Sequence, residues 1–175
     1  MNEVLKAIKE RRSIRKFKSD EVKSADIDKI IEAGLYAASG MGKQAAIAIA
    51  VTDRALRDEI SKDNCRIGGW DEGFDPFYGA PAMIIVLADK SVRTHVYDGS
   101  LALGNMMLAA HSIGIDSIWI HRAKEEFEMP KYKQLLRDLG IEGEFEGIGH
   151  LAIGYRDGDA PKAADRKEGR VLYVK

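Results

Sequence analysis

The chain has 175 residues, of which 45% are hydrophobic and 31% are charged. This balance is typical of globular proteins and argues against extensive disorder. The length suits one domain with a core of its own, so we expect a single domain spanning residues 1–175. The formal net charge is −1, which argues against a general polyanion-binding surface and therefore against a nucleic-acid-binding protein.

Hydrophobic runs in the chain are short. The longest, residues 45–51, cannot cross a bilayer, and residues 1–12 contain acids but no apolar core of a leader peptide. We therefore expect a cytoplasmic protein with no membrane partner. Cys65 is the only cysteine, which excludes an intrachain disulfide and a cysteine metal cluster.

Charge is distributed unevenly along the chain. Residues 1–18 carry seven cations and two anions, and residues 156–175 carry six cations and four anions. The residues between them are acidic overall. Two basic ends around an acidic body indicate a local anion site.

Helical and strand patterns alternate along the sequence. A first helix is expected to end near Arg12, and a second, capped by Ser24 or Asp26, carries its apolar face to Leu35. Further helices are expected at 53–62, 97–113 and 130–139. Strands are expected at 46–51, 83–88, 117–120 and 148–155. This order predicts an α+β or α/β fold with helices packed on one central sheet.

Two segments fall outside this pattern. Residues 64–81 are rich in glycine, proline and aromatic residues and predict a long loop, in which Trp70, Phe74, Phe77 and Tyr78 either stack on a flat ligand or pack the loop itself. The tail is polar and basic from Arg156 to Arg170 and closes with the apolar sequence VLYV. Such an ending needs a surface to pack against, and a partner subunit is one candidate.

Common catalytic and nucleotide-binding motifs are not found. The sequence GMGKQA at 40–45 matches the GxGxxG/A fingerprint, but here a helix precedes it and a strand follows, which is the reverse of a dinucleotide site. No P-loop or GxSxG elbow is present. The four histidines have no metal-ligand spacing. With no metal site and no visible acid, base or nucleophile set, an enzyme of this sequence would depend on a bound cofactor for its chemistry.

The basic stretch RRSIRKF at 11–17 contains the residue types that bind phosphate. Guanidinium groups match phosphate oxygens in pairs, and a serine hydroxyl adds a neutral donor. Hydrogen bonds to charged groups contribute roughly 1.5 to 3 kcal/mol each. From these residues alone, a phosphate site and a solvated basic turn are equally good interpretations.

Several segments, in order, resemble the FMN-dependent nitroreductase family over nearly the whole chain. They are RRSIRKF, AASGMGKQ, FYGAPAMIIVLAD, YDGSLALGNMMLAAHSIGIDSIWI, HLAIGY and PKAADRKEGRV. The resemblance implies an α+β fold with a mostly antiparallel central sheet flanked by helices. It also implies an intertwined homodimer with exchanged C-terminal tails and an FMN at each of two interface sites.

The activity implied by the resemblance is oxidoreduction. NADH or NADPH would reduce the flavin and leave, and a nitroaromatic, a quinone or another small acceptor would then bind in the same place, in a ping-pong mechanism. Two alternatives stay open: a relative with dehalogenase or flavin-consuming activity, and a flavin-binding protein without turnover.

The resemblance also assigns residues to the cofactor. Arg11 and Ser13 would contact the FMN phosphate, Arg12 the phosphate or ribityl side, and Arg15 the N1 and O2 edge of the ring. A cation at that edge stabilises the charge that reduction places there. The other cofactor-binding residues implied are Arg166 with Lys162 or Lys167 from the tail, and Ala38, Ser39, Gly40, Met41 and Gln44, with residues 38–41 coming from the other subunit.

Three further residues have two interpretations each. The resemblance places the backbone amides around His121 and Arg122 opposite flavin N5, whereas the side chain of His121 either reaches the substrate or takes no part. Asn105 either bonds the flavin edge or is a satisfied core asparagine.

Overall fold

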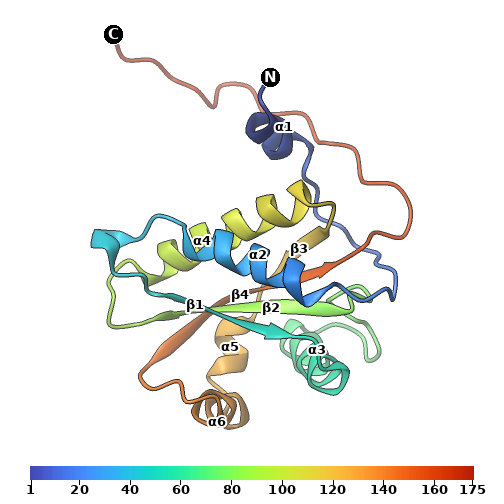
Figure 1. The fold of residues 1–175 in the computed structure, drawn as a ribbon, viewed down its shortest axis with the longest axis vertical. Helices are drawn as coiled ribbons and strands as arrows, with labels where there is room; N and C mark the ends of the chain where they lie inside the picture. Colours follow the sequence, from blue (N-terminus) through green and yellow to red (C-terminus); the bar gives the residue numbers. More distant parts are fainter.

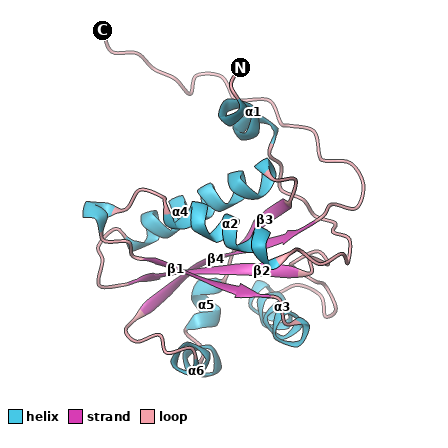
Figure 2. Cartoon of the chain, viewed as in Figure 1, coloured by secondary structure: helices cyan, strands magenta, loops and turns pink.

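The computed structural model describes all 175 residues and has a central sheet with helices on both faces (Figures 1 and 2). The four strands are β1 (Ala46–Val51), β2 (Ala82–Asp89), β3 (Asp116–Ile120) and β4 (Phe145–Gly154). Their order is β1-β2-β4-β3, and every neighbouring pair is antiparallel. The prediction of an α+β fold with an antiparallel sheet is confirmed.

Strand β2 is buried on both faces because helices cover the sheet above and below. Its side chains alternate between two hydrophobic cores, as the twofold repeat of a strand requires. Ile84 and Val86 belong to one core, and Met83, Ile85 and Leu87 belong to the other. The two cores therefore meet across a single layer of strands.

Helices α2 (Ser24–Leu35) and α4 (His95–Ser112) cover one face (Figure 1). Two glycines allow close packing there. A side chain at Gly34 would overlap Met106, and one at Gly99 would overlap Ile148 of β4. Helix α4 is therefore held both to α2 and to the sheet.

Helices α3 (Arg54–Gly68), α5 (Ala123–Phe127) and α6 (Pro130–Asp138) cover the opposite face (Figure 2). Asp53 caps α3 by accepting a hydrogen bond from the amide of Leu56 at 2.8 Å. Gly69, with φ 68°, ends the same helix in the left-handed conformation that glycine adopts most easily.

Two expected boundaries were wrong by several residues, and one helix was missed. Helix α3 continues to Gly68, so the loop begins at Gly69 and not at residue 64; helix α5 was not expected; and β4 begins at Phe145 instead of 148. The physical reason is the same for both helices. Their buried faces carry polar side chains, among them Asn64 in α3 and Glu126 in α5, that are held by tertiary hydrogen bonds. The apolar residues of these two helices therefore do not form the complete stripe by which an amphipathic helix is recognised in a sequence.

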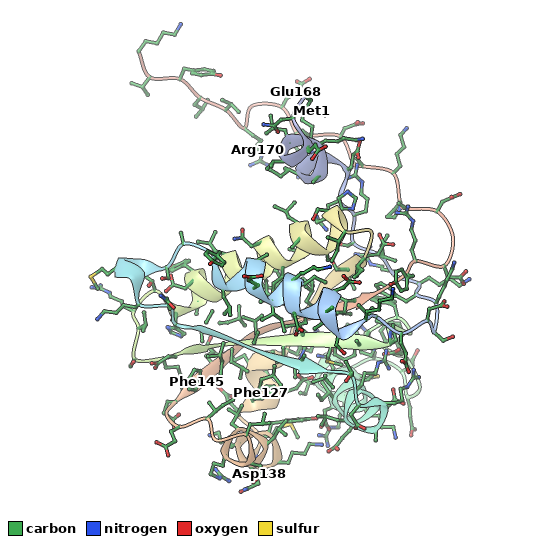
Figure 3. All side chains as sticks on the ribbon, in the orientation of Figure 1. Met1, Phe127, Asp138, Phe145, Glu168 and Arg170 are labelled. Atoms are coloured by element: carbon green, nitrogen blue, oxygen red, sulfur yellow. The ribbon has the colours of Figure 1, made fainter.

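Both ends of the chain project from the same end of the molecule (Figure 3). Helix α1 (Glu3–Glu10) has no buried residue, and its apolar residues Val4, Leu5 and Ile8 are at least half exposed. Residues 158–175 are exposed and form no strand in this chain, including the apolar segment 171–174. No helix is long and apolar enough to cross a membrane.

Candidate functional site

The basic stretch lies beside the edge strand β3. Helix α1 ends at Glu10, and the amide of Arg11 closes its last turn on the Ala7 carbonyl at 2.9 Å. The chain then extends, and Ser13 forms a parallel bridge with Ser117, supported by a 3.2 Å hydrogen bond from the amide of Ile14 to the Ser117 carbonyl. Arg11 and Ser13 are thus fixed next to the sheet.

The three arginines of this stretch have different surroundings. Nη1 of Arg11 is buried without a hydrogen-bond partner, and burial, with the nearby Arg12, lowers the Arg11 pKa from its usual 12.5. The Arg12 guanidinium donates to the carbonyls of Lys9 and Arg11 at 2.6 and 2.7 Å, which stabilises the C-terminus of α1. Arg15 is exposed. Of the three, Arg11 has a buried donor that an anion would satisfy.

The beginning of the tail lies beside the basic stretch. The amide of Lys18 donates to the Tyr155 carbonyl at 2.8 Å, the amide of Asp157 donates to the Lys16 carbonyl at 3.0 Å, and the Lys16 and Asp157 side chains form a 2.6 Å ion pair. Further along, the tail leaves the body of the molecule (Figure 1).

The expected tail cations have no ion-pair partner within this chain. Lys162, Arg166 and Lys167 are all exposed. The Arg166 side chain donates only to the Ala164 carbonyl, with its Nη2 at 2.6 Å. All three side chains therefore remain free to bind an anion.

The segment 38–44 is tethered to the start of α4. It contains the short 3-10 helix η1 (Gly40–Gly42). The amide of Gly40 donates to Asp98 at 3.1 Å, and the amide of Gln44 donates to the Ser39 hydroxyl at 3.1 Å. Met41 and Gln44 have φ angles of 52° and 50°, and the Met41 side chain is 91% exposed. The tethers hold Met41 outward, where it contacts little of its own chain.

This segment and the basic stretch lie in different places. In Figure 1, η1 sits at the far end of the α2 and α4 layer, away from α1. One subunit alone consequently does not bring residues 38–44 next to Arg11.

A cavity of about 690 Å³ opens where β3 ends and α5 begins. Trp119, His121 and Arg122 contribute to its wall, and the Trp119 indole Nε1 is buried without a partner. The exposed His121 ring packs against the Trp119 ring at 5.7 Å between centroids. This cavity combines apolar and polar wall residues, as ligand sites commonly do.

Asn105 belongs to the helix layer. Its Nδ2 donates to the Ala33 carbonyl of α2 at 3.2 Å. In this chain it therefore links α4 to α2, which agrees with the interpretation of a satisfied asparagine.

Sequence reasoning missed a buried polar cluster behind the 690 Å³ cavity. The side chains of Asn64, Glu126 and His150 are fully buried, and they come from α3, α5 and β4. Nδ2 of Asn64 donates to Glu126 at 2.9 Å and to the His121 carbonyl at 2.8 Å, and Glu126 also bonds the His150 ring. A histidine within the otherwise apolar strand sequence IGHLAIGY was the one available signal.

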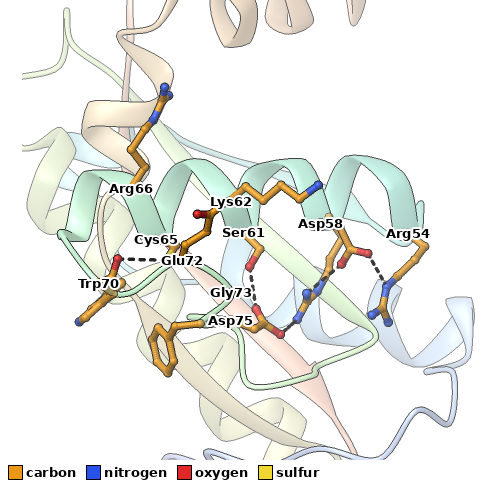
Figure 4. Close-up of a pocket in the computed structure, with 12 residues that line it drawn as sticks. Arg54, Asp58, Ser61, Lys62, Cys65, Arg66, Trp70, Glu72, Gly73 and Asp75 are labelled. Carbon is orange, nitrogen blue, oxygen red and sulfur yellow. Dashed lines mark hydrogen bonds and ion pairs between the residues drawn. The ribbon is translucent and has the colours of Figure 1, made fainter.

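A second large cavity, of about 760 Å³, lies between α3 and the loop that follows it (Figure 4). Its charges are largely paired. The buried Arg57 bonds Asp75 at 2.5 Å and Asp58 at 2.9 Å, and Ser61 donates to Asp75 at 2.7 Å. Burial alone would raise the Asp75 pKa, but these bonds and the amide of Gly79 leave it below its usual 3.8.

The four aromatic residues of the loop after α3 differ in how far they are exposed. Phe77 is fully buried, which settles its role as packing, and Tyr78 is half-buried. Trp70 and Phe74 are 41% and 40% exposed and contact each other edge to face at 5.3 Å between centroids.

Comparison with known proteins identifies the family. A model of the nitroreductase family matches residues 8–66 and 69–155. A protein of Archaeoglobus fulgidus, provisionally named an NADH dehydrogenase/NAD(P)H nitroreductase, is 31% identical over 163 residues, covering 89% of this chain and 86% of that protein. An FMN reductase [NAD(P)H] of Bacillus subtilis is 28% identical and covers 81% of this chain and 66% of its own length.

A solved structure has the same fold throughout. The nitroreductase of Bacteroides fragilis with bound FMN superposes with a TM-score of 0.90 at 30% identity, covering 100% of both chains. Together with the family match over most of the sequence, this likeness establishes that the chain belongs to the nitroreductase family.

Proposed function

We propose that this chain is an FMN-dependent oxidoreductase that takes electrons from NADH or NADPH and passes them to a small acceptor, such as a nitroaromatic or a quinone, by a ping-pong mechanism. The observation that carries the proposal is the buried Nη1 of Arg11, which has no protein partner next to Ser13. A similar chain, the Bacteroides fragilis nitroreductase, binds FMN.

The residues present fit an FMN phosphate. A phosphate oxygen would satisfy the Arg11 guanidinium, and the Ser13 hydroxyl would add a neutral donor. Arg15, which is exposed, would lie toward the ring edge where reduction places negative charge. The bound flavin would supply the electron transfer itself, while the protein would hold it and shield it from water.

We further propose a homodimer that completes the site. Large apolar side chains remain exposed on the same surfaces as the separated site residues: Leu5 is 50%, Tyr97 72% and Met41 91% exposed. Helix α1 and η1, which carry Leu5 and Met41, lie apart in one chain, and apolar side chains left exposed on both are surface that a partner subunit would cover. In a dimer, Ala38, Ser39, Gly40, Met41 and Gln44 of one subunit would cover the ring held by the other.

The tail would add to the same interface. Val171, Leu172, Tyr173 and Val174 are 69% to 102% exposed, although most of them are strongly apolar. If the tail crosses to the partner subunit, Arg166, with Lys162 or Lys167, would bind the phosphate held there. The backbone around His121 and Arg122 would face the flavin ring.

Purified protein tests the proposal in two steps. Bound FMN gives an absorbance band near 450 nm, a property of the cofactor itself, and adding NADH or NADPH without oxygen should bleach it. A nitroaromatic or quinone should then restore the colour. Protein that shows no band after FMN addition, or a band that neither nicotinamide bleaches, contradicts the proposed function.

A further inference from the structure

Arg122 has an unusual backbone conformation. It directly follows His121 after strand β3, caps α5, and has φ 80° and ψ 5°. Residues other than glycine seldom occupy this left-handed region, and those that do tend to cluster at functional sites. Such a conformation persists only where the surrounding structure determines it.

Two contacts hold the backbone on either side of Arg122 in place. The Asn64 amide holds the His121 carbonyl at 2.8 Å and is itself held by the buried Glu126. On the other side, Gly147 lets the backbone of Ala123 lie directly on β4, because a Cβ at position 147 would overlap the Ala123 carbonyl group. The position of Arg122 at the mouth of the 690 Å³ cavity is thereby set on both sides.

The Arg122 side chain lies on an aromatic face. Its guanidinium carbon is 4.5 Å from the centroid of the Trp70 ring, within the range of a cation–π interaction. Trp70 is supported in turn by Phe74. The contact shields part of the guanidinium from water and restricts its motion, so its remaining donors are held in place for a ligand.

Arg122 has no anionic partner in the structure. It takes part in none of the ion pairs and in no side-chain hydrogen bond, whereas Glu146 on the same cavity wall is paired with Lys124 at 3.2 Å and lies 3.7 Å from His95. The other acid of the wall is the exposed Glu125. The guanidinium is therefore a positioned cation without a protein partner, on a residue that lines a cavity large enough for an aromatic ligand.

We infer that Arg122, stacked on Trp70, binds an anionic group of the electron acceptor, so that the preferred acceptors are flat aromatic compounds carrying a carboxylate or sulfonate. The inference rests on the proposed function, because the resemblance places the 121–122 backbone against the reactive part of the flavin. Arg122 would favour a charged acceptor because that acceptor binds more tightly than its neutral analogue.

A binding experiment on the protein as purified tests this directly. By calorimetry, 4-nitrobenzoate should bind roughly tenfold more tightly than the neutral 4-nitrobenzyl alcohol, which is the difference expected from one charge-assisted pair. Arg122→Gln should abolish that preference, and Arg122→Lys should retain part of it. Trp70→Leu should reduce it, since the cation remains but is no longer held.

The control is Lys133→Gln, which removes one positive charge from the exposed surface of α6. It should leave the preference for 4-nitrobenzoate unchanged. Equal binding of the two compounds by the unaltered protein, a preference that survives Arg122→Gln, or an equal loss in the Lys133 variant would each overturn the inference.

Measuring the two half-reactions separately shows whether Arg122 binds the acceptor or a phosphate of the nicotinamide cofactor. With reduced protein, Arg122→Gln should raise the half-saturating concentration of 4-nitrobenzoate about tenfold more than that of the neutral 4-nitrobenzyl alcohol. An effect confined to bleaching contradicts the inference. Protein that holds no flavin contradicts the proposed function instead, and the calorimetric comparison still decides whether Arg122 binds anions.

Discussion

Two arginines, Arg57 in α3 and Arg11 after α1, are held in opposite ways. Arg57 is 2% exposed, and its guanidinium donates to Asp58, Asp75 and the Ala80 carbonyl. Arg11 is only partly buried, yet its Nη1 is enclosed without any partner. Burial alone does not distinguish a structural cation from one that awaits a ligand, whereas the list of partners does.

The same contrast extends to the surroundings of each residue. Around Arg57, the carboxylate of Asp75 also accepts from Ser61 and from the amides of Phe77 and Gly79, so the loop is closed on itself. Around Arg11, helix α1 and the tail leave apolar side chains in solvent. The first region is complete in one chain, and we propose that the second is completed by FMN and a partner subunit.

The largest expected effect is on stability, at Arg57. Arg57→Ala leaves Asp75 without its buried partner, and breaking such a pair costs about 3 to 5 kcal/mol. Urea unfolding followed by circular dichroism measures this. The matched control is Arg54→Ala, because Arg54 is exposed and pairs with Asp58 at 2.9 Å; its loss should cost under about 1 kcal/mol. Equal costs for the two variants would contradict the structural role of Arg57.

A smaller effect is expected on the pH dependence of the free energy of unfolding, through Asp75. Because its pKa in the folded protein lies below the unfolded value of 3.8, the stabilisation it provides is fully present well above pH 3.8 and is lost as the pH falls through the folded pKa. Asp75→Asn should lower the free energy of unfolding at neutral pH and flatten its acid dependence. Unfolding curves at several pH values between neutral and acid check this, and an unchanged acid slope would contradict it.

The smallest expected effect is on association. Deleting residues 171–175 removes the apolar end of the tail, and we expect the dimer to dissociate about tenfold more readily, which corresponds to about 1.5 kcal/mol, the lower end of what one buried apolar side chain contributes. Sedimentation over a range of concentrations measures this. A native protein that is monomeric, or a deletion without effect, would contradict the proposed interface.

Much of the fold could be predicted because its elements repeat a simple pattern. The buried strand MIIVLA and the apolar helix around residues 97–113 are recognisable from composition alone. Helix α5 and the second half of α3 could not be predicted, because Asn64 and Glu126 face inward and are held by hydrogen bonds to residues distant in sequence.

One part of the candidate site could likewise be predicted from the sequence, and another part could not. The sequence of residues 11–17 indicates an anion site, since phosphate-binding residue types stand side by side in it. The stack of Arg122 on Trp70 joins a loop to the start of a helix. Only tertiary structure brings those two side chains together, so no spacing in the sequence could have revealed it.

The most direct test of the central contrast is the affinity of Arg11→Ala for FMN, measured by quenching of flavin fluorescence. The account predicts that affinity falls about tenfold to a hundredfold, as expected for a lost hydrogen bond to a charged group. The urea midpoint should be unchanged, because the Arg11 side chain has no protein partner to lose. Lys9→Ala, which removes an exposed cation from α1, should leave FMN affinity unaltered. Unchanged FMN affinity in Arg11→Ala would contradict the account.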